Sequence, residues 1–276
     1  MPAGTPAALP RRRKRFGQHF LHDPRIIDRI VQALAAHPGD HLVEIGPGRG
    51  ALTARLLALS GCTLDAIEID RDLAGQLRAR FTGSPDRVLH EGDALEFDFS
   101  ALARERGGRL RILGNLPYNI STPLLFQLLR HAAAITDLTV MLQREVVARI
   151  AAAPGDSAYG RLSVMLAPYL AVQRLFDVGP GAFQPPPRVW SAVVRLTVRP
   201  QPLFAVSPHY AAVVAAAFAQ RRKTLRNALS EILTADEISA CAIDPQARPG
   251  TLAPGAFNTL AQAAGRAALD RARCGR

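Results

Sequence analysis

Short apolar runs alternate with helically spaced apolar positions over the first half of the chain. Asp23 followed by Pro24 has the form of a helix N-cap and first turn, and Pro123 after Ser121 and Thr122 predicts a second helix start. Because strands alternate with helices at this rhythm, we expect a parallel, doubly wound sheet in an α/β domain. Strands are expected at 41–45, 63–70, 87–90, 110–115 and 137–142, and helices at 24–37, 51–59, 71–80, 99–106 and 123–131.

Chemically informative residues close four successive strands of this pattern: Gly46, Glu68, Asp93 and Asn115. Sheets of this kind bind ligands beyond the carboxyl ends of their strands. The glycine-rich loop 46–50 lets the backbone approach a cofactor, Glu68 is placed to hold ribose hydroxyls, and Asp93 suits the amino group of an adenine. These residues alone fit a dinucleotide enzyme and a methyltransferase equally well.

The fourth strand ends in the stiff turn Asn115-Leu116-Pro117-Tyr118. Pro117 cannot donate to a sheet ladder and favours an extended Leu116, so the carbonyls of Asn115 and Leu116 are expected to point out of the sheet. Two acceptors beside an aromatic ring suit a planar base with an exocyclic amine. By themselves these four residues favour an ordinary strand-to-helix connection, so the preceding strand ends must decide between the two interpretations.

Positive charge is concentrated at both ends of the chain, whose net charge is +11. Residues 11–15 carry five positive charges, residues 16–170 have a balance of −1, and residues 171–276 have a balance of +7. A neutral core between basic ends predicts surfaces that hold a polyanion. We expect a basic, disordered arm over 1–15, a catalytic domain over 16–199 and an RNA-binding domain over 200–276.

The C-terminal domain is predicted to be small and all-helical. Prolines 200, 202 and 208 mark its boundary, and helices are expected from 210 through 229, near 234–241 and over 256–272. On the first helix Arg222 and Arg226 would share a face. Phosphate contact is assigned to the basic cluster, defined as Arg221, Arg222, Lys223 and Arg226.

Several classes of protein are disfavoured by composition. The sequence has no run of 18 or more apolar residues, the length that a membrane-spanning helix needs. The basic segment 11–15 is not followed by the apolar stretch of a secretory signal. Cys62, Cys241 and Cys274 lack metal-ligand spacing, so we expect neither a metal site nor a disulfide framework, and a cytoplasmic location.

A set of motifs then identifies a family. The segments are KRFGQ at 14–18, VEIGPG at 43–48, IEIDRDL at 67–73, GNLPYNISTP at 114–123, MLQREVV at 141–147, YGRLSV at 159–164, AFQPPPRV at 182–189 and QRRK at 220–223. Together they resemble the ribosomal RNA adenine dimethyltransferases, most closely the bacterial small-subunit members, over roughly residues 12–264.

The resemblance implies a Rossmann-like fold and S-adenosylmethionine as methyl donor. It further implies dimethylation of two adjacent adenosines near the 3′ end of small-subunit ribosomal RNA, in an immature subunit, by a monomer. The cofactor would lie against His19, Leu21, Gly46, Glu68, Asp93 and Asn115. At His19 the family commonly has Asn, and His can both donate a hydrogen bond and titrate.

The expected chemistry is in-line methyl transfer to an adenine amine held by the Asn115 side chain and the Leu116 carbonyl, without a metal. Tyr118 would stack on the base, with Pro117 stiffening the turn. Phe183 would supply a second stacking face beside prolines 185–187, although core packing is nearly as natural a role for it.

Three other functions stay open on the sequence. A large-subunit methyltransferase of the antibiotic-resistance type shares the family pattern, and a non-catalytic nucleic-acid-binding relative shares the fold. A nicotinamide dehydrogenase would need a catalytic acid–base group, and no residue of that kind stands out.

Overall fold

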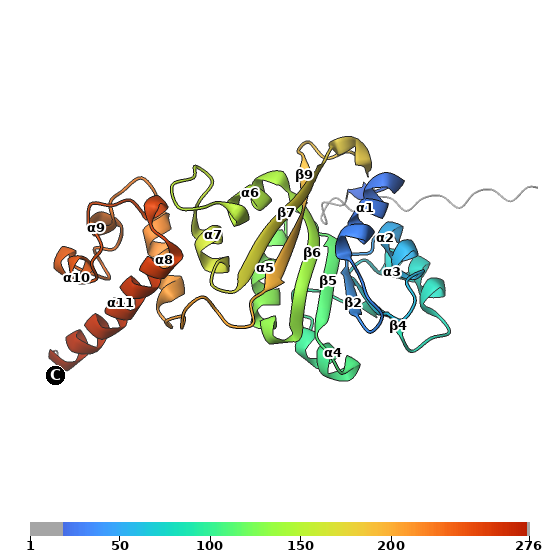
Figure 1. Cartoon of the computed structure of the whole chain (residues 1–276), viewed down its shortest axis with the longest axis horizontal. Coiled ribbons are helices and arrows are strands. Elements are labelled where there is room, and N and C mark those ends of the chain that lie inside the picture. The colour runs from blue at the N-terminus through green and yellow to red at the C-terminus, as the bar shows by residue number, and fades with distance from the viewer. Residues whose placement is uncertain (1–18, 275–276) are drawn as a thin grey trace, which may run out of the picture. The chain divides into compact units, whose positions relative to one another are not determined.

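The computed structural model describes residues 19–274, which divide into two compact units (Figure 1). Described residues up to Arg144, together with Arg174–Leu196, form the first unit. Glu145–Gln173 joins the residues from Thr197 onward in the second. The two units are therefore not separated by a single boundary at 199/200, because Glu145–Gln173 belongs to the same unit as the C-terminal helices. The domain limits 16–199 and 200–276 stay a prediction, and the basic arm 11–15 lies outside the described residues.

A seven-stranded sheet confirms the predicted α/β fold. Its order is β4-β3-β2-β5-β6-β9-β7, and the pairs from β4 to β6 are parallel. Its strands are β2 (His41–Ile45), β3 (Thr63–Glu68), β4 (Arg87–Glu91), β5 (Leu110–Asn115), β6 (Ile135–Gln143), β7 (Leu170–Val178) and β9 (Ser191–Val198). The chain builds β2 to β4 toward one side and then returns to place β5 beside β2. The crevice at such a reversal is where these sheets bind ligands.

The helices of the first unit lie close to their predicted positions. They are α1 (Pro24–Leu34), α2 (Ala51–Leu56), α3 (Arg71–Leu77), α4 (Phe99–Arg106) and α5 (Ser121–Arg130), with short 3₁₀ turns at Arg78–Phe81, Ala132–Ala134 and Pro180–Ala182. The Asp23 carboxylate accepts from the Arg25 N–H at 2.9 Å, which confirms the predicted cap. The predicted start of α5 was wrong. The helix begins at Ser121 with Ile120 as N-cap, because the Ser121 hydroxyl donates to the Tyr118 carbonyl instead of capping.

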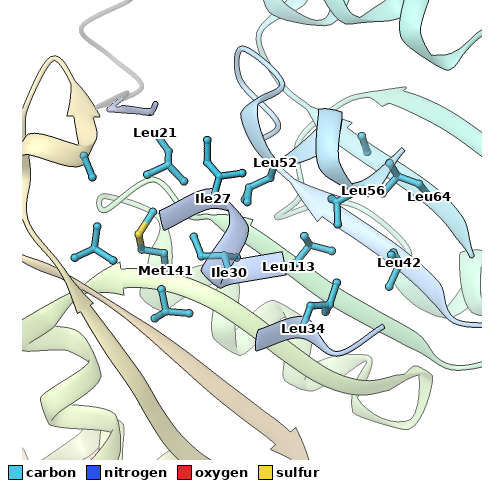
Figure 2. Close-up of a cluster of buried hydrophobic side chains, with 14 of the residues drawn as sticks. Leu21, Ile27, Ile30, Leu34, Leu42, Leu52, Leu56, Leu64, Leu113 and Met141 are labelled. Carbon is cyan, nitrogen blue, oxygen red and sulfur yellow. The ribbon is translucent and has the colours of Figure 1, made fainter. Parts of the chain in front are cut away.

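The core of the first unit forms where α1 covers the sheet. Ile27, Ile30 and Leu34 recur at helical spacing on the buried face of α1. Figure 2 shows these side chains meeting leucines of α2 and the side chains of Leu113 on β5 and Met141 on β6. Each such burial contributes about 1.5–3 kcal/mol. This packing fixes α1 against the sheet and against α2.

Gly114 permits β5 to approach β2 immediately before Asn115. A Cβ atom at Gly114 would lie 2.5 Å from the carbonyl oxygen of Ile45, a distance at which backbone atoms must shift. Only glycine therefore fits without displacing one of the two strand ends. The motif residue before Asn115 thus has a packing role.

A separate two-stranded sheet joins the start of the described chain to its middle. Strand β1 (Phe20–Leu21) pairs antiparallel with β8 (Phe183–Gln184), with Leu21 opposite Phe183. The segment from His19 to Leu21 is thereby fixed to the first unit beside α1.

The second unit is helical around a core of aromatic and aliphatic side chains. The hydroxyls of the buried Tyr159 and Tyr210 donate to the carbonyls of Leu252 and Val164, at 2.7 and 2.9 Å. Burial raises the pKa of both phenols far above the usual value, so both stay neutral donors. The helices are α6 (Arg144–Ala151), α7 (Arg161–Leu166), α8 (Tyr210–Ala219), α9 (Leu225–Ala228), α10 (Ala235–Ser239) and α11 (Pro254–Cys274), with a 3₁₀ turn at Pro249–Thr251.

Candidate active site

A cavity of about 320 Å³ opens at the carboxyl ends of β2, β3, β4 and β5. This volume lies at the lower end of the ~300–1,000 Å³ typical of small-molecule sites. All its lining residues belong to the first unit. They include the predicted residues His19, Leu21, Gly46, Glu68, Asp93, Asn115, Leu116, Pro117 and Tyr118. The fold therefore brings together residues that are up to 99 positions apart in the sequence.

Glu68 is held rigidly at the end of β3. One carboxylate oxygen accepts from the Gly48 N–H at 3.0 Å, and the other accepts from the Asp70 N–H at 2.9 Å. Burial raises the pKa of this carboxyl, and the two backbone donors act in the opposite direction. Each oxygen keeps a lone pair, so the group is oriented to accept two further hydrogen bonds from a diol.

Glycine residues of the loop after β2 form part of the cavity wall. Gly46 and Gly48 have left-handed φ angles of +66° and +58°, a conformation that residues with a Cβ rarely adopt. A Cβ at Gly48 would also lie 3.2 Å from the Phe20 ring. Glycine at position 48 therefore suits both the left-handed backbone and the close approach of the Phe20 ring.

Asp93 follows β4 and also lines the cavity. Its Oδ1 accepts from the Leu95 N–H at 2.9 Å, which fixes the carboxylate and leaves Oδ2 as a further acceptor. The neighbouring wall includes Ile69, a large apolar side chain that is 45% exposed. An uncovered apolar surface next to an acceptor suits a planar base with an amino group.

Asn115 is oriented by its own amide nitrogen. Its Nδ2 donates to the His19 carbonyl at 2.9 Å, so its Oδ1 is left as an acceptor at the cavity. The Leu116 N–H donates to the Met141 carbonyl at 3.2 Å, and within the described chain no N–H donates to the carbonyl of Leu116. The Asn115 Oδ1 and the Leu116 carbonyl thus have no hydrogen-bond donor within the described chain, and their role as acceptors for a substrate amine stays a prediction.

Tyr118 is fixed at both ends of its side chain. Its hydroxyl lies 2.6 Å from the Ser191 Oγ, and its ring stacks on His19 with 5.7 Å between ring centroids. Burial raises the pKa of the phenol, so it stays neutral. Ser191, at the start of β9, was not predicted from the sequence, because no periodicity or spacing marks a serine that holds a distant tyrosine.

His19 has a defined tautomer in the neutral ring. Its Nδ1 lies 2.8 Å from the carbonyl oxygen of Pro185, and a carbonyl can only accept, so Nδ1 carries the hydrogen. Nε2 is then the acceptor of the ring. This side chain differs from an asparagine in hydrogen-bond pattern, although its backbone carbonyl serves Asn115 regardless of the side chain.

Phe183 does not line the cavity. Its side chain is 2% exposed and belongs to the core cluster under β1, because the pairing of β8 with β1 turns it inward opposite Leu21. The prediction of a second stacking face at Phe183 is not supported by this geometry. Core packing, its alternative role, accounts for the residue.

Glu44 lines the same cavity and was missed. Its carboxyl is 1% exposed and accepts from the Thr53 hydroxyl at 2.6 Å. Burial raises its pKa to about 7, the Thr53 hydrogen bond opposes this, and the charge of Glu68 adds to it. The sequence did contain a signal for Glu44, because an acidic residue inside a predicted buried strand stands close before the glycine-rich loop.

The basic cluster is exposed in the second unit. Arg221 donates to the Ser157 carbonyl at 2.5 Å, and within the described chain no carboxylate forms an ion pair with any of its four members. The predicted continuous helix from 210 through 229 was wrong. Helix α8 ends at Ala219 and α9 begins at Leu225, so Arg222 and Arg226 do not share one helical face.

Among residues 19–269, whose side chains the structure describes, no three His, Cys, Asp or Glu side chains gather as a metal-binding group. No helix in the described part of the chain has the length and apolarity required to cross a bilayer.

S-adenosylmethionine, implied by the sequence resemblance, fits this set of residues. A fixed acid for ribose hydroxyls (Glu68), an acceptor for an adenine amine (Asp93) and an uncovered apolar wall (Ile69) surround one cavity. Two buried acids, Glu44 and Glu68, suit a ligand that carries positive charge.

Comparisons with known proteins agree with this geometry. The sequence model of the ribosomal RNA adenine dimethylase family matches residues 10–264. A ribosomal RNA small subunit methyltransferase A from Pseudomonas aeruginosa is 53% identical over 258 residues, which cover 91% of this chain and 94% of that protein. The protein of the same name from Hahella chejuensis is 53% identical over 242 residues, covering 87% and 88%.

Solved structures give the same result. A dimethyladenosine transferase from Plasmodium falciparum superposes with a TM-score of 0.75 at 25% identity, covering 88% of this chain and 96% of that one. The 23S rRNA methyltransferase ErmE superposes with a TM-score of 0.68 at 25% identity, covering 89% and 99%.

Proposed function

The chain belongs to the ribosomal RNA adenine dimethylase family, and from that premise we propose that it methylates adenine amines of small-subunit ribosomal RNA. One observation carries the proposal. Asn115 and Leu116 line the same cavity as Glu68 and Asp93, and the Asn115 Oδ1 and the Leu116 carbonyl have no donor within the described chain, which supports acceptors for an adenine amine beside a site for the methyl donor.

The residues that would hold the donor are Glu68 at the ribose, Asp93 at the adenine and the backbone of Gly46 and Gly48. Once bound, S-adenosylmethionine supplies an electrophilic methyl group on a positively charged sulfur. His19 lines the cavity and is held there by its stacking on Tyr118 and its hydrogen bond to the Pro185 carbonyl.

The turn after β5 activates the amine by holding it. An adenine amine is a poor nucleophile because its lone pair is delocalised into the ring. When its two N–H groups donate to the Asn115 Oδ1 and the Leu116 carbonyl, the nitrogen is held toward tetrahedral geometry and its lone pair becomes available. Tyr118 offers a ring face for the base, and its hydroxyl is fixed by Ser191. Proximity and orientation are then the main sources of rate.

The substrate is proposed to be two adjacent adenosines near the 3′ end of the small-subunit RNA, within an immature subunit in the cytoplasm, with a monomeric enzyme. The relatives at 53% identity, named for the small subunit, support this choice over the large subunit, whose solved relative ErmE is 25% identical.

Mapping of methylated adenines in small-subunit and large-subunit RNA, incubated with the protein and labelled S-adenosylmethionine, tests the proposal. We expect N6,N6-dimethyladenosine at two adjacent positions near the 3′ end of the small-subunit RNA. Label in large-subunit RNA alone would assign the antibiotic-resistance type of activity, and RNA binding without any label would assign a non-catalytic role.

A further inference from the structure

An exposed aromatic patch lies one residue outside the site. Trp190 is 50% exposed and Val189 is 43% exposed, which makes two adjacent large apolar side chains open to solvent. Neither lines the cavity. Arg188, the residue before them, is also exposed, and within the described chain no carboxylate pairs with it. Nothing in the chemistry of methyl transfer requires a tryptophan here.

Contacts of both the backbone and the ring hold Trp190 in a defined position. Its carbonyl accepts from the Arg144 N–H at 2.9 Å, and its ring lies against Gly179, where a Cβ would come within 3.6 Å of it. The Arg144 guanidinium lies over the ring, 5.9 Å from its centroid. An ordered indole with arginine beside it is a preformed stacking surface.

The position of the ring relates it to the target base. Ser191, the next residue, is buried and holds the hydroxyl of Tyr118. Since consecutive Cα atoms are about 3.8 Å apart, Trp190 begins one residue from the group that fixes the proposed base-stacking ring. The patch is therefore close enough to the cavity to be reached by nucleotides that neighbour an adenine bound there.

Charge favours RNA over a protein partner as the occupant. Arg144 and Arg174 both lie close to Asp177, so these three side chains together have a net charge of +1. Arg188 adds a second positive charge. Single-stranded RNA is bound by aromatic rings and arginine planes that stack on bases, with guanidinium groups on the phosphates.

We propose that Trp190, with Arg144 and Arg188, is a stacking site for a nucleobase that neighbours the target adenosine in the substrate RNA strand. This inference rests on the proposed function, because it needs a single-stranded RNA at the cavity. It assigns to the patch a role in holding the strand, with no part in the transfer itself.

Trp190 is the only tryptophan in the chain, so its fluorescence reports on this site directly. The probe is a single-stranded ten-nucleotide oligoadenylate at low salt, with a blunt RNA duplex of equal length as the comparison. We expect strong quenching by the single strand and weak quenching by the duplex. Trp190→Ala should weaken single-strand binding about tenfold, and Trp190→Phe should recover most of the loss. Leu203→Ala, which removes another exposed apolar side chain, is the matched control and should change neither the quenching nor the affinity for the single strand.

Methylation of small-subunit RNA separates the two claims. If the wild-type protein methylates the RNA and Trp190→Ala raises KM with little change in kcat, the inference is supported. Unquenched fluorescence together with unchanged binding and KM in Trp190→Ala would overturn it while leaving the proposed function intact. Absence of methylation by the wild-type protein would instead overturn the proposed function.

Discussion

The side-chain nitrogen of Asn115 donates to the backbone carbonyl of His19 at 2.9 Å, across 96 positions of sequence. This bond decides which end of the carboxamide faces the cavity, and so makes Oδ1 an acceptor for an amine. It also explains why the short strand β1 matters to the site. Its pairing with β8 fixes the segment that holds the carbonyl of His19 in position.

We expect Asn115→Ala to lower kcat about 100-fold or more, because the amine loses one of the two acceptors that orient it. The measurement is single-turnover methylation of small-subunit RNA at saturating cofactor. Asn115→Asp is the matched variant, since it keeps the shape but loses the donor to His19 and adds charge. A near wild-type rate in Asn115→Ala would show that the carboxamide does not hold the substrate.

Gly114→Ala should lower the free energy of unfolding by about 1–3 kcal/mol, because its Cβ would lie 2.5 Å from the Ile45 carbonyl. Urea denaturation of the cofactor-free protein measures this. Gly75→Ala is the control: it lies within helix α3 with nothing within 4 Å of the new methyl, and it should stabilise by up to ~1 kcal/mol. Equal effects of the two substitutions would contradict a specific clash between β5 and β2.

Local sequence pattern predicts much of this architecture. It does not predict features that depend on pairing between distant segments or on a helix break without a marking residue. The strand ends Gly46, Glu68, Asp93 and Asn115 are recoverable because parallel strands place their carboxyl ends at one edge. The sequence could not choose between stacking and core packing for Phe183, since that choice depends on the pairing of Phe183 with Leu21 across 162 positions. The helix break after Ala219 was missed because the residues of 220–224 have no proline or glycine to mark it.

Glu44 should make the stability of the cofactor-free protein depend on pH between about 4.5 and 7. Its pKa is about 7 when folded against an ordinary value of 4.5, so in this window the folded state keeps a proton that the unfolded state has released. The free energy of unfolding therefore falls as pH rises, by at most ~3 kcal/mol from this group. Urea denaturation at pH 5 and pH 8 should show this slope in the wild type and a smaller one in Glu44→Gln.

Burial also raises the pKa of Glu68, so Glu68 adds to the slope in both proteins, whereas the lowered pKa values of Asp40 and Asp65 act only at more acidic pH. An identical dependence on pH in the wild-type and Glu44→Gln proteins would assign the effect to other groups.

Binding of S-adenosylmethionine near pH 6.5 should release protons from Glu44, because a positively charged ligand in the same cavity favours the ionised carboxyl. Calorimetry in two buffers of different ionisation enthalpy measures the number released. We expect less release with S-adenosylhomocysteine, whose sulfur is neutral, and almost none in Glu44→Gln. Equal proton release by both ligands would show that Glu44 does not sense the sulfonium charge.

Replacement of Arg221, Arg222 and Lys223 by Gln should weaken RNA binding and reduce its salt dependence while leaving cofactor affinity unchanged. Each lost phosphate contact lowers the slope of log K against log salt by about 0.7–0.9. Arg222 and Lys223 are exposed and have no carboxylate partner in the described chain, whereas Arg221 is already positioned by the Ser157 carbonyl. The control is Arg78→Gln, which removes a charge that is paired with Glu91 and should hardly change the slope. A full salt slope in the triple variant would move the phosphate contacts elsewhere, and Arg226 and Arg248, both exposed in the same unit, would be the next to test.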